Sequence, residues 1–226
     1  MYDVYGQLWL PLTSLLVGRF ISKPMATQVS VVSNAIDLKG SVEVVADYFY
    51  VAINSILYVR GIYPERLFKQ VQKFGRTVLI AIDEELDKYL KCIVDQMRVW
   101  LQKGSLKRLV LAVKCSKTDE VLERWQFNVI REDNSNEKNL APKTTDQISS
   151  ELGGIVRQIV TSNAFLPTLS TSCTFDLLVY TDKNTDIPEG WGETGPRFVS
   201  NSTEVPLRSF STRIHKVESI VSYRLL

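Results

Sequence analysis

The chain has 226 residues and a mass of 25.7 kDa, which suits one large domain or two small ones. Its hydrophobic share of 45% and charged share of 23% are those of a globular protein that can fold without disulfides or a metal. Lysine and arginine number 27 against 25 acidic residues, and the resulting net charge of +2 argues against a nucleic-acid backbone as the main ligand.

The side chains that most catalytic and metal sites require are scarce. His215 is the one histidine, and the three cysteines, Cys92, Cys115 and Cys173, lie far apart in the sequence. A zinc site that used all four would have the wrong spacing, so we interpret the cysteines as small core thiols in a reducing compartment. We predict no catalytic residue, metal ligand or cofactor, and a binding protein rather than an enzyme. An enzyme with a cryptic cysteine site stays open as a rival.

Residues 1–35 carry few charges and differ in composition from the rest of the chain. Their apolar run, 8–17, is about half the length of a membrane-spanning helix, and Pro11 interrupts it. No basic residue precedes this run, unlike in a secretory signal. We therefore expect 1–35 to be a disordered extension and 36–226 to form the domain.

Two helices with wide apolar faces are predicted in the first half of the domain. The first runs from an N-cap at Ser41 to Gly61, and the second runs from an N-cap at Asp83 to Gly104. The short apolar run 77–82 between them fits either a strand or a helix.

An antiparallel hairpin is predicted next. Residues 109–114 and 121–130 carry the two strand signals, and a polar turn at 116–119 joins them. The charged and polar stretch 131–146 that follows is typical of an exposed loop.

A third helix is predicted over 144–163, ending before Pro167. The pair Gly153-Gly154 in its middle costs about 1 kcal/mol per glycine relative to alanine, so it either weakens the helix or marks a close contact.

The C-terminal part of the chain has strand patterns at 173–180, 205–213 and 216–225, with a turn-rich stretch over 181–201. Helices and strands are segregated rather than strictly alternating, which favours an α+β fold with a mainly antiparallel sheet.

Several colinear motifs together resemble the HORMA-domain family, and most closely its spindle assembly checkpoint branch. The resemblance spans about 36–226, and the motifs that carry it are 36–41, 54–58, 60–64, 122–127, 155–159, 165–167, 180–183, 207–212 and 214–217. It implies a HORMA domain of three helices packed on a mainly antiparallel sheet, with a mobile C-terminal safety-belt hairpin over about 182–226.

The resemblance also implies a mechanism of peptide capture. The belt would close over an extended partner peptide that pairs with the edge of the strand at 172–181. The alternating positions of that strand are Cys173, Phe175, Leu177 and Val179.

Self-association of an open with a closed copy through the third helix is implied as well, with Arg157, Gln158 and Phe165 at the matching positions. Ala164 and the glycine pair depart from the family pattern there. Trp100 matches a position linked to partner binding, although core filling is the interpretation from the sequence alone. Ser200, Ser202 and Ser219 lie in or beside the belt and are candidate phosphorylation sites.

By resemblance, the function is that of a spindle-checkpoint adaptor in the nucleus, at the kinetochore and in the cytoplasm. Its partners would be a peptide of the anaphase-promoting complex activator, a coiled-coil kinetochore receptor, a second copy of itself, and a remodelling AAA+ ATPase with its adaptor that could use 1–35 as a handle. No nucleic acid or membrane partner is expected. The alternative is a HORMA adaptor of translesion DNA synthesis or of the meiotic chromosome axis.

Overall fold

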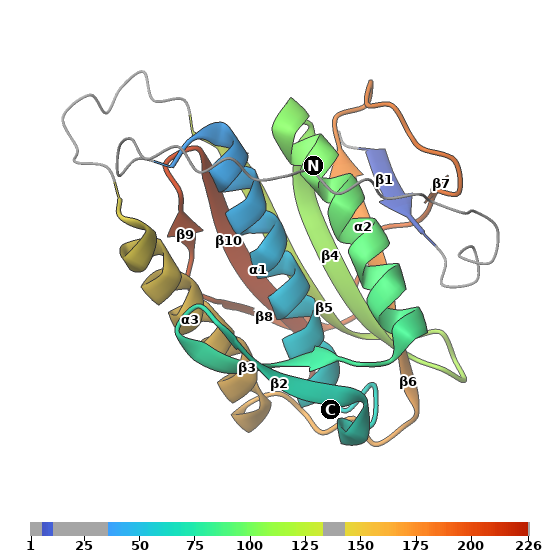
Figure 1. Cartoon of the computed structure of the whole chain (residues 1–226). Coiled ribbons are helices and arrows are strands. Elements are labelled where there is room, and N and C mark those ends of the chain that lie inside the picture. Colours follow the sequence, from blue (N-terminus) through green and yellow to red (C-terminus); the bar gives the residue numbers. More distant parts are fainter. Residues whose placement is uncertain (1–5, 11–35, 133–142, 226) are drawn as a thin grey trace.

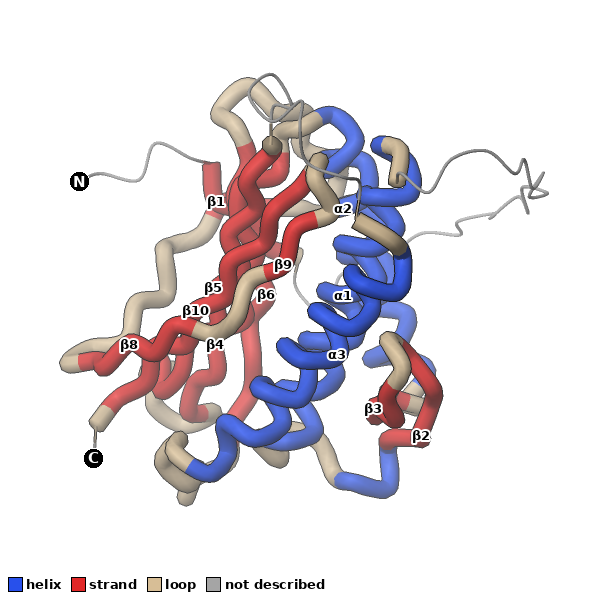
Figure 2. The backbone as a smooth tube through the Cα atoms, turned by 90° about the vertical axis from the view of Figure 1, so that its left-hand side faces the viewer, coloured by secondary structure: helices blue, strands red, loops and turns tan. Residues whose placement is uncertain are grey.

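The computed structural model of this protein describes residues 6–10, 36–132 and 143–225. Three helices cover one face of an eight-stranded sheet, and a two-stranded sheet packs outside the helices (Figures 1 and 2). The predicted α+β class, with three helices packed on a mainly antiparallel sheet, is confirmed.

The central helix, α1 (Leu38–Val59), begins earlier than the sequence predicted. The Asp37 carboxylate caps it by accepting a hydrogen bond from the Gly40 amide at 2.7 Å. The prediction that Ser41 is the N-cap is therefore wrong, because Ser41 is buried inside the first turn. Gly61, which follows the helix, has a φ of 63°, as expected of a C-terminal glycine. Among the described residues α1 is the one helix apolar and long enough to cross a membrane, but 67% of that window is buried in the fold.

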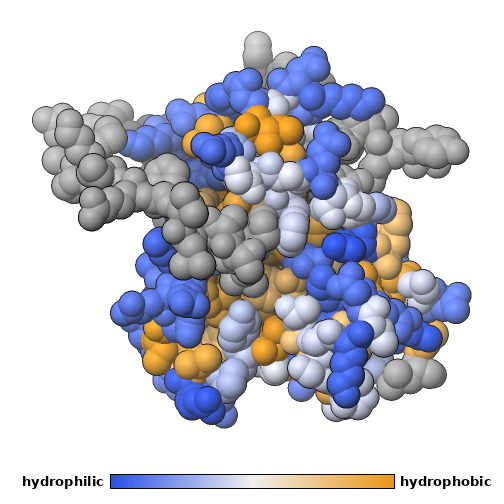
Figure 3. Space-filling model, turned by 90° about the vertical axis from the view of Figure 1, so that its right-hand side faces the viewer, coloured by the Kyte–Doolittle hydropathy of each residue, from blue (hydrophilic) through white to orange (hydrophobic). Residues whose placement is uncertain are grey.

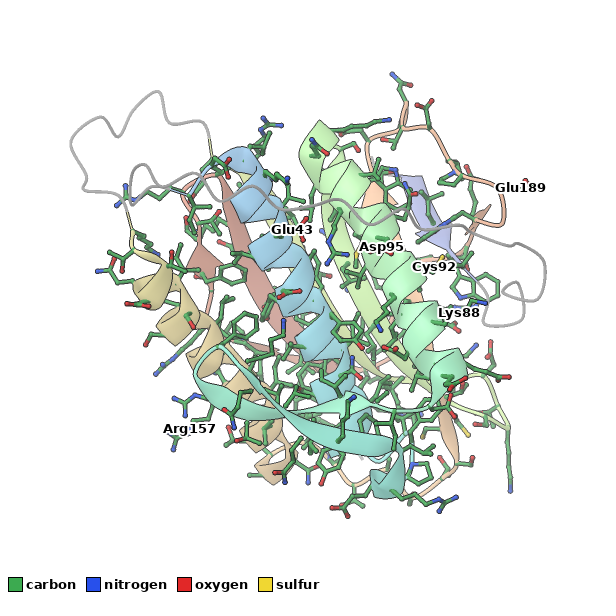
Figure 4. The ribbon with its side chains drawn as sticks, in the orientation of Figure 1. Glu43, Lys88, Cys92, Asp95, Arg157 and Glu189 are labelled. Carbon is green, nitrogen blue, oxygen red and sulfur yellow. The ribbon has the colours of Figure 1, made fainter. Side chains whose placement is uncertain are left out.

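Helix α2 (Glu84–Lys103) has the predicted ends. The Asp83 carboxylate accepts a hydrogen bond from the Leu86 amide at 2.9 Å, and Gly104 closes the helix with a φ of 75°. The Arg98 guanidinium bonds the Glu43 carboxylate of α1 at 3.0 Å, so the two helices are linked on their outer side (Figure 4).

Strands β2 (Phe68–Lys73) and β3 (Arg76–Ala81) form the outer hairpin after the short 3-10 helix η2 (Glu65–Leu67). The apolar run at 77–82 is thus a strand. The sequence did not predict β2, because its side chains are mostly polar and exposed.

Helix α3 (Thr145–Thr161) begins with a capping box between Thr144 and Gln147 and continues into the 3-10 helix η3 (Ser162–Ala164). A Cβ atom built on Gly153 would lie 2.7 Å from the Phe74 carbonyl oxygen in the turn between β2 and β3. The glycine pair therefore marks a close contact. Residues 133–142 of the predicted loop before α3 lie outside the described residues.

The large sheet has the order β7-β1-β6-β4-β5-β10-β8, with β9 paired to β10. Its strands are β1 (Gly6–Trp9), β4 (Leu106–Cys115), β5 (Val121–Arg131), β6 (Cys173–Thr181), β7 (Gly192–Glu193), β8 (Ser202–Pro206), β9 (Phe210–Ser211) and β10 (His215–Arg224). The predicted hairpin is confirmed as β4 and β5. The predicted single strand at 205–213 is wrong, because the chain leaves the sheet after Pro206 and the Arg208 amide bonds the Gln158 side chain of α3.

Each face of the large sheet has its own apolar cluster. The main core lies between the helices and the sheet, and its largest buried side chains include Trp100, Trp125 and Tyr48. The opposite face carries a small cluster composed of Val110, Ala112, Val121, Leu178, Tyr180 and Val199.

The expectation that all of 1–35 is disordered is wrong for residues 6–10. Gly6–Trp9 forms β1, and Leu8 and Leu10 are buried members of the main core. Alternating apolar side chains at an unpaired sheet edge stabilise this segment as a strand. The remainder of the predicted extension, 1–5 and 11–35, lies outside the described residues.

The two adjacent glycines of α3 provide a matched pair of substitutions. We expect Gly153→Ala to lower the free energy of unfolding by about 1–3 kcal/mol, because its Cβ overlaps a backbone oxygen. Gly154→Ala meets only the end of the Arg208 side chain at 3.5 Å and should raise stability by about 0.5–1 kcal/mol through helix propensity. Urea unfolding of both variants measures the difference, and equal effects would contradict the close contact.

Candidate functional site

Strand β6 is the centre of the candidate site. It pairs with β4 along one side, while its other side carries β1. The predicted edge residues share the face that turns toward the helices: Phe175, Leu177 and Val179 are buried there, and Cys173 is half-buried. Recognition at this edge therefore falls to the backbone of β6, because these side chains belong to the core.

The edge of β6 that faces away from β4 is occupied by the N-terminal segment of the same chain. In the antiparallel register Gly6 lies opposite Thr181, Leu8 opposite Val179 and Trp9 opposite Leu178. Leu8 is 1% exposed and Leu10 5% exposed, so both side chains enter the core. The Tyr89 hydroxyl of α2 donates a hydrogen bond to the Leu10 carbonyl oxygen at 2.8 Å.

The start of the predicted belt closes the other side of this segment. Strand β7 pairs with β1, with Leu8 opposite Glu193 and Trp9 opposite Gly192 (Figure 1). The ring of Trp191 packs edge-on against Trp100 of α2, with centroids 5.0 Å apart. Trp100 is thus a buried core residue, as the sequence suggested, and it also holds the belt.

After β7 the belt crosses the sheet on the face away from the helices. Strands β7 and β8 stand at opposite ends of the sheet order, so eight residues, 194–201, connect the two edges. Six strand spacings amount to about 29 Å, close to the reach of about 31 Å for the nine residue steps when extended. The crossing therefore spans most of the width of the sheet, although the positive φ values of Arg197 and Asn201 bend its path.

Two side chains hold the crossing against the sheet. The Arg197 guanidinium lies 3.0 Å from the buried Asp176 carboxylate of β6. Val199 is buried in the small cluster between Val110 and Tyr180. Both contacts are made by side chains on the face of the sheet, so the crossing does not form a further strand of it.

The far end of the belt is held by buried polar contacts with α1. Ser41 Oγ lies 2.7 Å from His215 Nδ1 and 2.6 Å from Thr212 Oγ1. The Tyr48 hydroxyl lies 3.1 Å from Ser219 Oγ. Strand β10 pairs with β5 along its whole length, from His215 to Tyr223.

The three predicted self-association residues separate into two groups. Arg157 points away from α3 into solvent (Figure 4), and Phe165 is 44% exposed. Gln158 instead accepts a hydrogen bond from the Arg208 amide of the belt at 2.8 Å. Val160, which lies between Arg157 and Phe165 in the sequence, is also exposed and adds an apolar side chain to this surface.

The candidate phosphorylation sites differ in burial. Ser200 and Ser202 are exposed, whereas Ser219 is 2% exposed beneath α1. A kinase can therefore reach Ser219 only when β10 has left the sheet.

The cysteines do not gather with the histidine. Cys115 and Cys173 lie opposite each other on β4 and β6, while His215 bonds Ser41 and Thr212. A hydrogen bond from the Thr118 side chain, with backbone bonds from Lys117 and Thr118, lowers the pKa of Cys115 to about 7. Within 6–10, 36–132 and 143–225, no group of three or more His, Cys, Asp or Glu side chains suits a metal ion.

Sequence reasoning missed Leu8, Leu10 and Trp191, which all act in closing the site. The alternation of Leu8 and Leu10 before Pro11 was visible as a short strand pattern, but it was assigned to the extension. No sequence signal indicated that Trp191 would meet Trp100, because the two residues lie far apart in the chain.

Comparisons with known proteins agree with this geometry. The sequence profile described as HORMA domain matches residues 41–215. The human mitotic spindle assembly checkpoint protein MAD2A is 49% identical over 203 residues, which cover 89% of this chain and 98% of the relative.

Solved structures give the same result for the fold. A chain in the crystal structure of the mitotic checkpoint complex superposes with a TM-score of 0.75 at 39% identity, covering 82% of this chain and 99% of that one. C. elegans HTP-1 bound to HTP-3 motif-1 superposes with a TM-score of 0.68 at 16% identity, covering 84% and 92% of the two chains. This second likeness concerns the fold alone.

The buried contact between His215 of β10 and Ser41 of α1 is sensitive to acid. Burial, and then the nearby Arg131 charge, lower the pKa of His215, while the Leu101 carbonyl and Glu132 oppose the shift. Because the unfolded chain binds the proton more tightly, stability should fall as the pH drops from about 6.5 toward the lowered pKa, by up to about 1.4 kcal/mol per pH unit.

Denaturant unfolding at pH 7.5 and pH 5.5 tests this expectation. His215→Asn retains a polar group toward Ser41 without titrating, so it should lose less stability over this interval than the unmodified chain. Since His215 is the one histidine in the sequence, an identical pH dependence in both proteins would contradict the assignment.

Proposed function

The chain belongs to the HORMA-domain family, and from that premise we propose that it is a spindle-checkpoint adaptor that traps a short peptide under its C-terminal belt. Its relatives carry the name of mitotic spindle checkpoint proteins, and one similar chain belongs to the mitotic checkpoint complex. The observation that supports trapping most directly is the position of an extended segment between β6 and β7.

The physical basis of the trap is pairing on both sides of the bound segment. The edge of β6 supplies main-chain hydrogen bonds, which give affinity, while the alternate side chains of the bound segment give specificity. The belt then adds β7 on the outer side and crosses the sheet to β8 and β10. A ligand held in this way cannot leave until the belt has moved, so we expect slow dissociation.

The proposed ligands are a peptide of the anaphase-promoting complex activator and a peptide of a coiled-coil kinetochore receptor, and capture of the former delays anaphase. A remodelling AAA+ ATPase with its adaptor would reopen the closed form, with the N-terminal residues as a handle. The protein acts without catalysis or a cofactor, in the nucleus, at the kinetochore and in the cytoplasm. The alternative remains an adaptor of translesion DNA synthesis or of the meiotic chromosome axis.

Phosphorylation is proposed to act on the belt at Ser219. A phosphate on Ser219 would face Tyr48 in the core and could not be solvated there, so it would hold the belt open. The same modification at Ser200 or Ser202 adds charge at exposed positions and should have a weaker effect.

The function is tested with fluorescent synthetic peptides from the activator, the translesion polymerase and the meiotic axis. We expect the purified chain to retain the activator peptide, and Trp191→Ala to release it about 10–100-fold faster, because the contact with Trp100 is lost. Ile187→Ala, at an exposed belt position, serves as the control and should leave the rate unchanged. Preference for either of the other two peptides would reject the checkpoint assignment in favour of the alternative.

Self-association is proposed to use the outer surface of α3. Arg157→Glu should weaken dimer formation at least tenfold in analytical ultracentrifugation, because an exposed interface arginine changes sign. Arg66→Glu, which makes the same charge change at the exposed η2, is the control. Equal weakening by both variants would point to net charge instead of a defined interface.

A further inference from the structure

We propose that residues Gly6–Leu10 are an internal ligand of this protein, which occupies the partner-peptide edge of β6 in the free chain and must be displaced before a partner can bind. This inference rests on the proposed function, since it assigns the occupant and the regulation of the same site. It concerns a segment outside the match to the family profile, which covers residues 41–215.

The first argument is the position of the segment in the sheet. β1 is the one strand between β6 and β7 in the sheet order, so it lies inside the belt and not beside it (Figure 1). A strand added outside a finished sheet would pair on one side only. Pairing with both the fixed edge and the belt is the arrangement proposed above for a trapped partner.

The second argument is the depth to which its side chains are buried. Leu8 and Leu10 belong to the same apolar cluster as Phe175 and Leu177 of β6. Leu10 also lies next to Gly190 of the belt, where an added Cβ atom would be 3.6 Å from Leu10 Cδ1. Burial of the two leucine side chains away from water stabilises the segment at the edge of β6.

The third argument is that residues 6–10 and the edge of β6 belong to the same chain, which is long enough to bring them together. Twenty-five residues, 11–35, separate Leu10 from Ile36. At full extension a chain of that length reaches about 80–90 Å, so the covalent connection allows Leu10 to lie at the β6 edge. Because the segment and the edge belong to one molecule, occupancy of the edge by the segment does not depend on protein concentration.

The segment also defines the chemistry of the partner that would replace it. The partner peptide must be extended and must carry bulky aliphatic side chains two residues apart, as Leu8 and Leu10 are. A proline can follow the second aliphatic residue, as Pro11 follows Leu10 in this sequence. Because a proline nitrogen cannot donate a hydrogen bond, pairing with the strand would end there. Figure 3, which faces the right-hand side of Figure 1 where β1 and β7 lie, shows apolar residues at the surface among hydrophilic ones.

Displacement of the segment has a measurable consequence for affinity. A partner binds only the fraction of molecules whose edge is free, so the apparent dissociation constant rises by the inverse of that fraction. Variants that weaken the internal ligand should therefore bind external peptides more tightly, whereas ordinary destabilising variants should not.

The experiment uses the full chain and a fluorescent peptide with the sequence of residues 1–12 as the probe. Leu8→Asp/Leu10→Asp removes the buried side chains from the internal ligand and leaves the amino-acid sequences of β6 and of the belt unchanged. Ile82→Asp/Leu225→Asp introduces the same two charges at exposed apolar positions and is the control. We expect the first variant to bind the peptide at least tenfold more tightly than the unmodified chain and the control.

Equal binding by all three proteins, or binding by none, would overturn the proposal. The peptide of the anaphase-promoting complex activator, measured with the same three proteins, separates the two ideas. If all three bind the activator peptide equally, the internal ligand is rejected and the checkpoint function stands. If none binds it, the proposed function itself fails.

Amide exchange on the unmodified chain gives a second measurement that does not depend on how the variants fold. The amides of residues 6–10 should be protected, and this protection should persist on dilution because the ligand belongs to the same molecule. Rapid exchange of these amides would overturn the proposal. Protection that disappears on dilution, together with dimers in light scattering, would assign the segment to a second copy and overturn the internal arrangement.

Discussion

The crossing of the sheet by residues 194–201 is the constraint on which the closed arrangement depends. These eight residues connect β7 at one edge with β8 at the other, so a short segment spans most of the width of the sheet. The two ends of the crossing are therefore limited in how far they can separate. Arg197 and Val199 fix its middle on β6 and on the small cluster, so the two edges of the sheet are mechanically connected through the belt.

The rest of the fold is stabilised independently of the belt. The Arg60 guanidinium at the end of α1 lies 2.9 Å from the Glu123 carboxylate of β5, and both side chains are buried. The same guanidinium bonds Asn163 and the Pro167 carbonyl beyond α3. These contacts join α1, the sheet and the end of α3 without any belt residue.

The sequence was informative where local signals decide the structure, and less so where distant segments meet. Asp83 and Gly104 marked the ends of α2 because capping depends on neighbouring residues alone. Ser41 looked like an N-cap, but its hydroxyl is used by His215, 174 residues away. The sequence predicts the segment at 6–10 to be part of a disordered extension, because a four-residue strand has no stability until it pairs with a sheet edge. The path of the crossing depends on the order of the strands in the sheet, which no local pattern contains.

The pairing of β7 explains how occupancy of the edge and closure of the belt are coupled. Within the described residues, β7 ends the sheet and has β1 as its one strand partner. If no segment is paired with the edge of β6, the amides of β7 have no strand partner, and that end of the crossing is no longer held by the sheet. A segment at the edge therefore stabilises the closed belt, and the closed belt strengthens binding of the segment by the same free energy. A chain that carries its own segment would close without a partner, and each partner would then compete against an occupant already inside the belt.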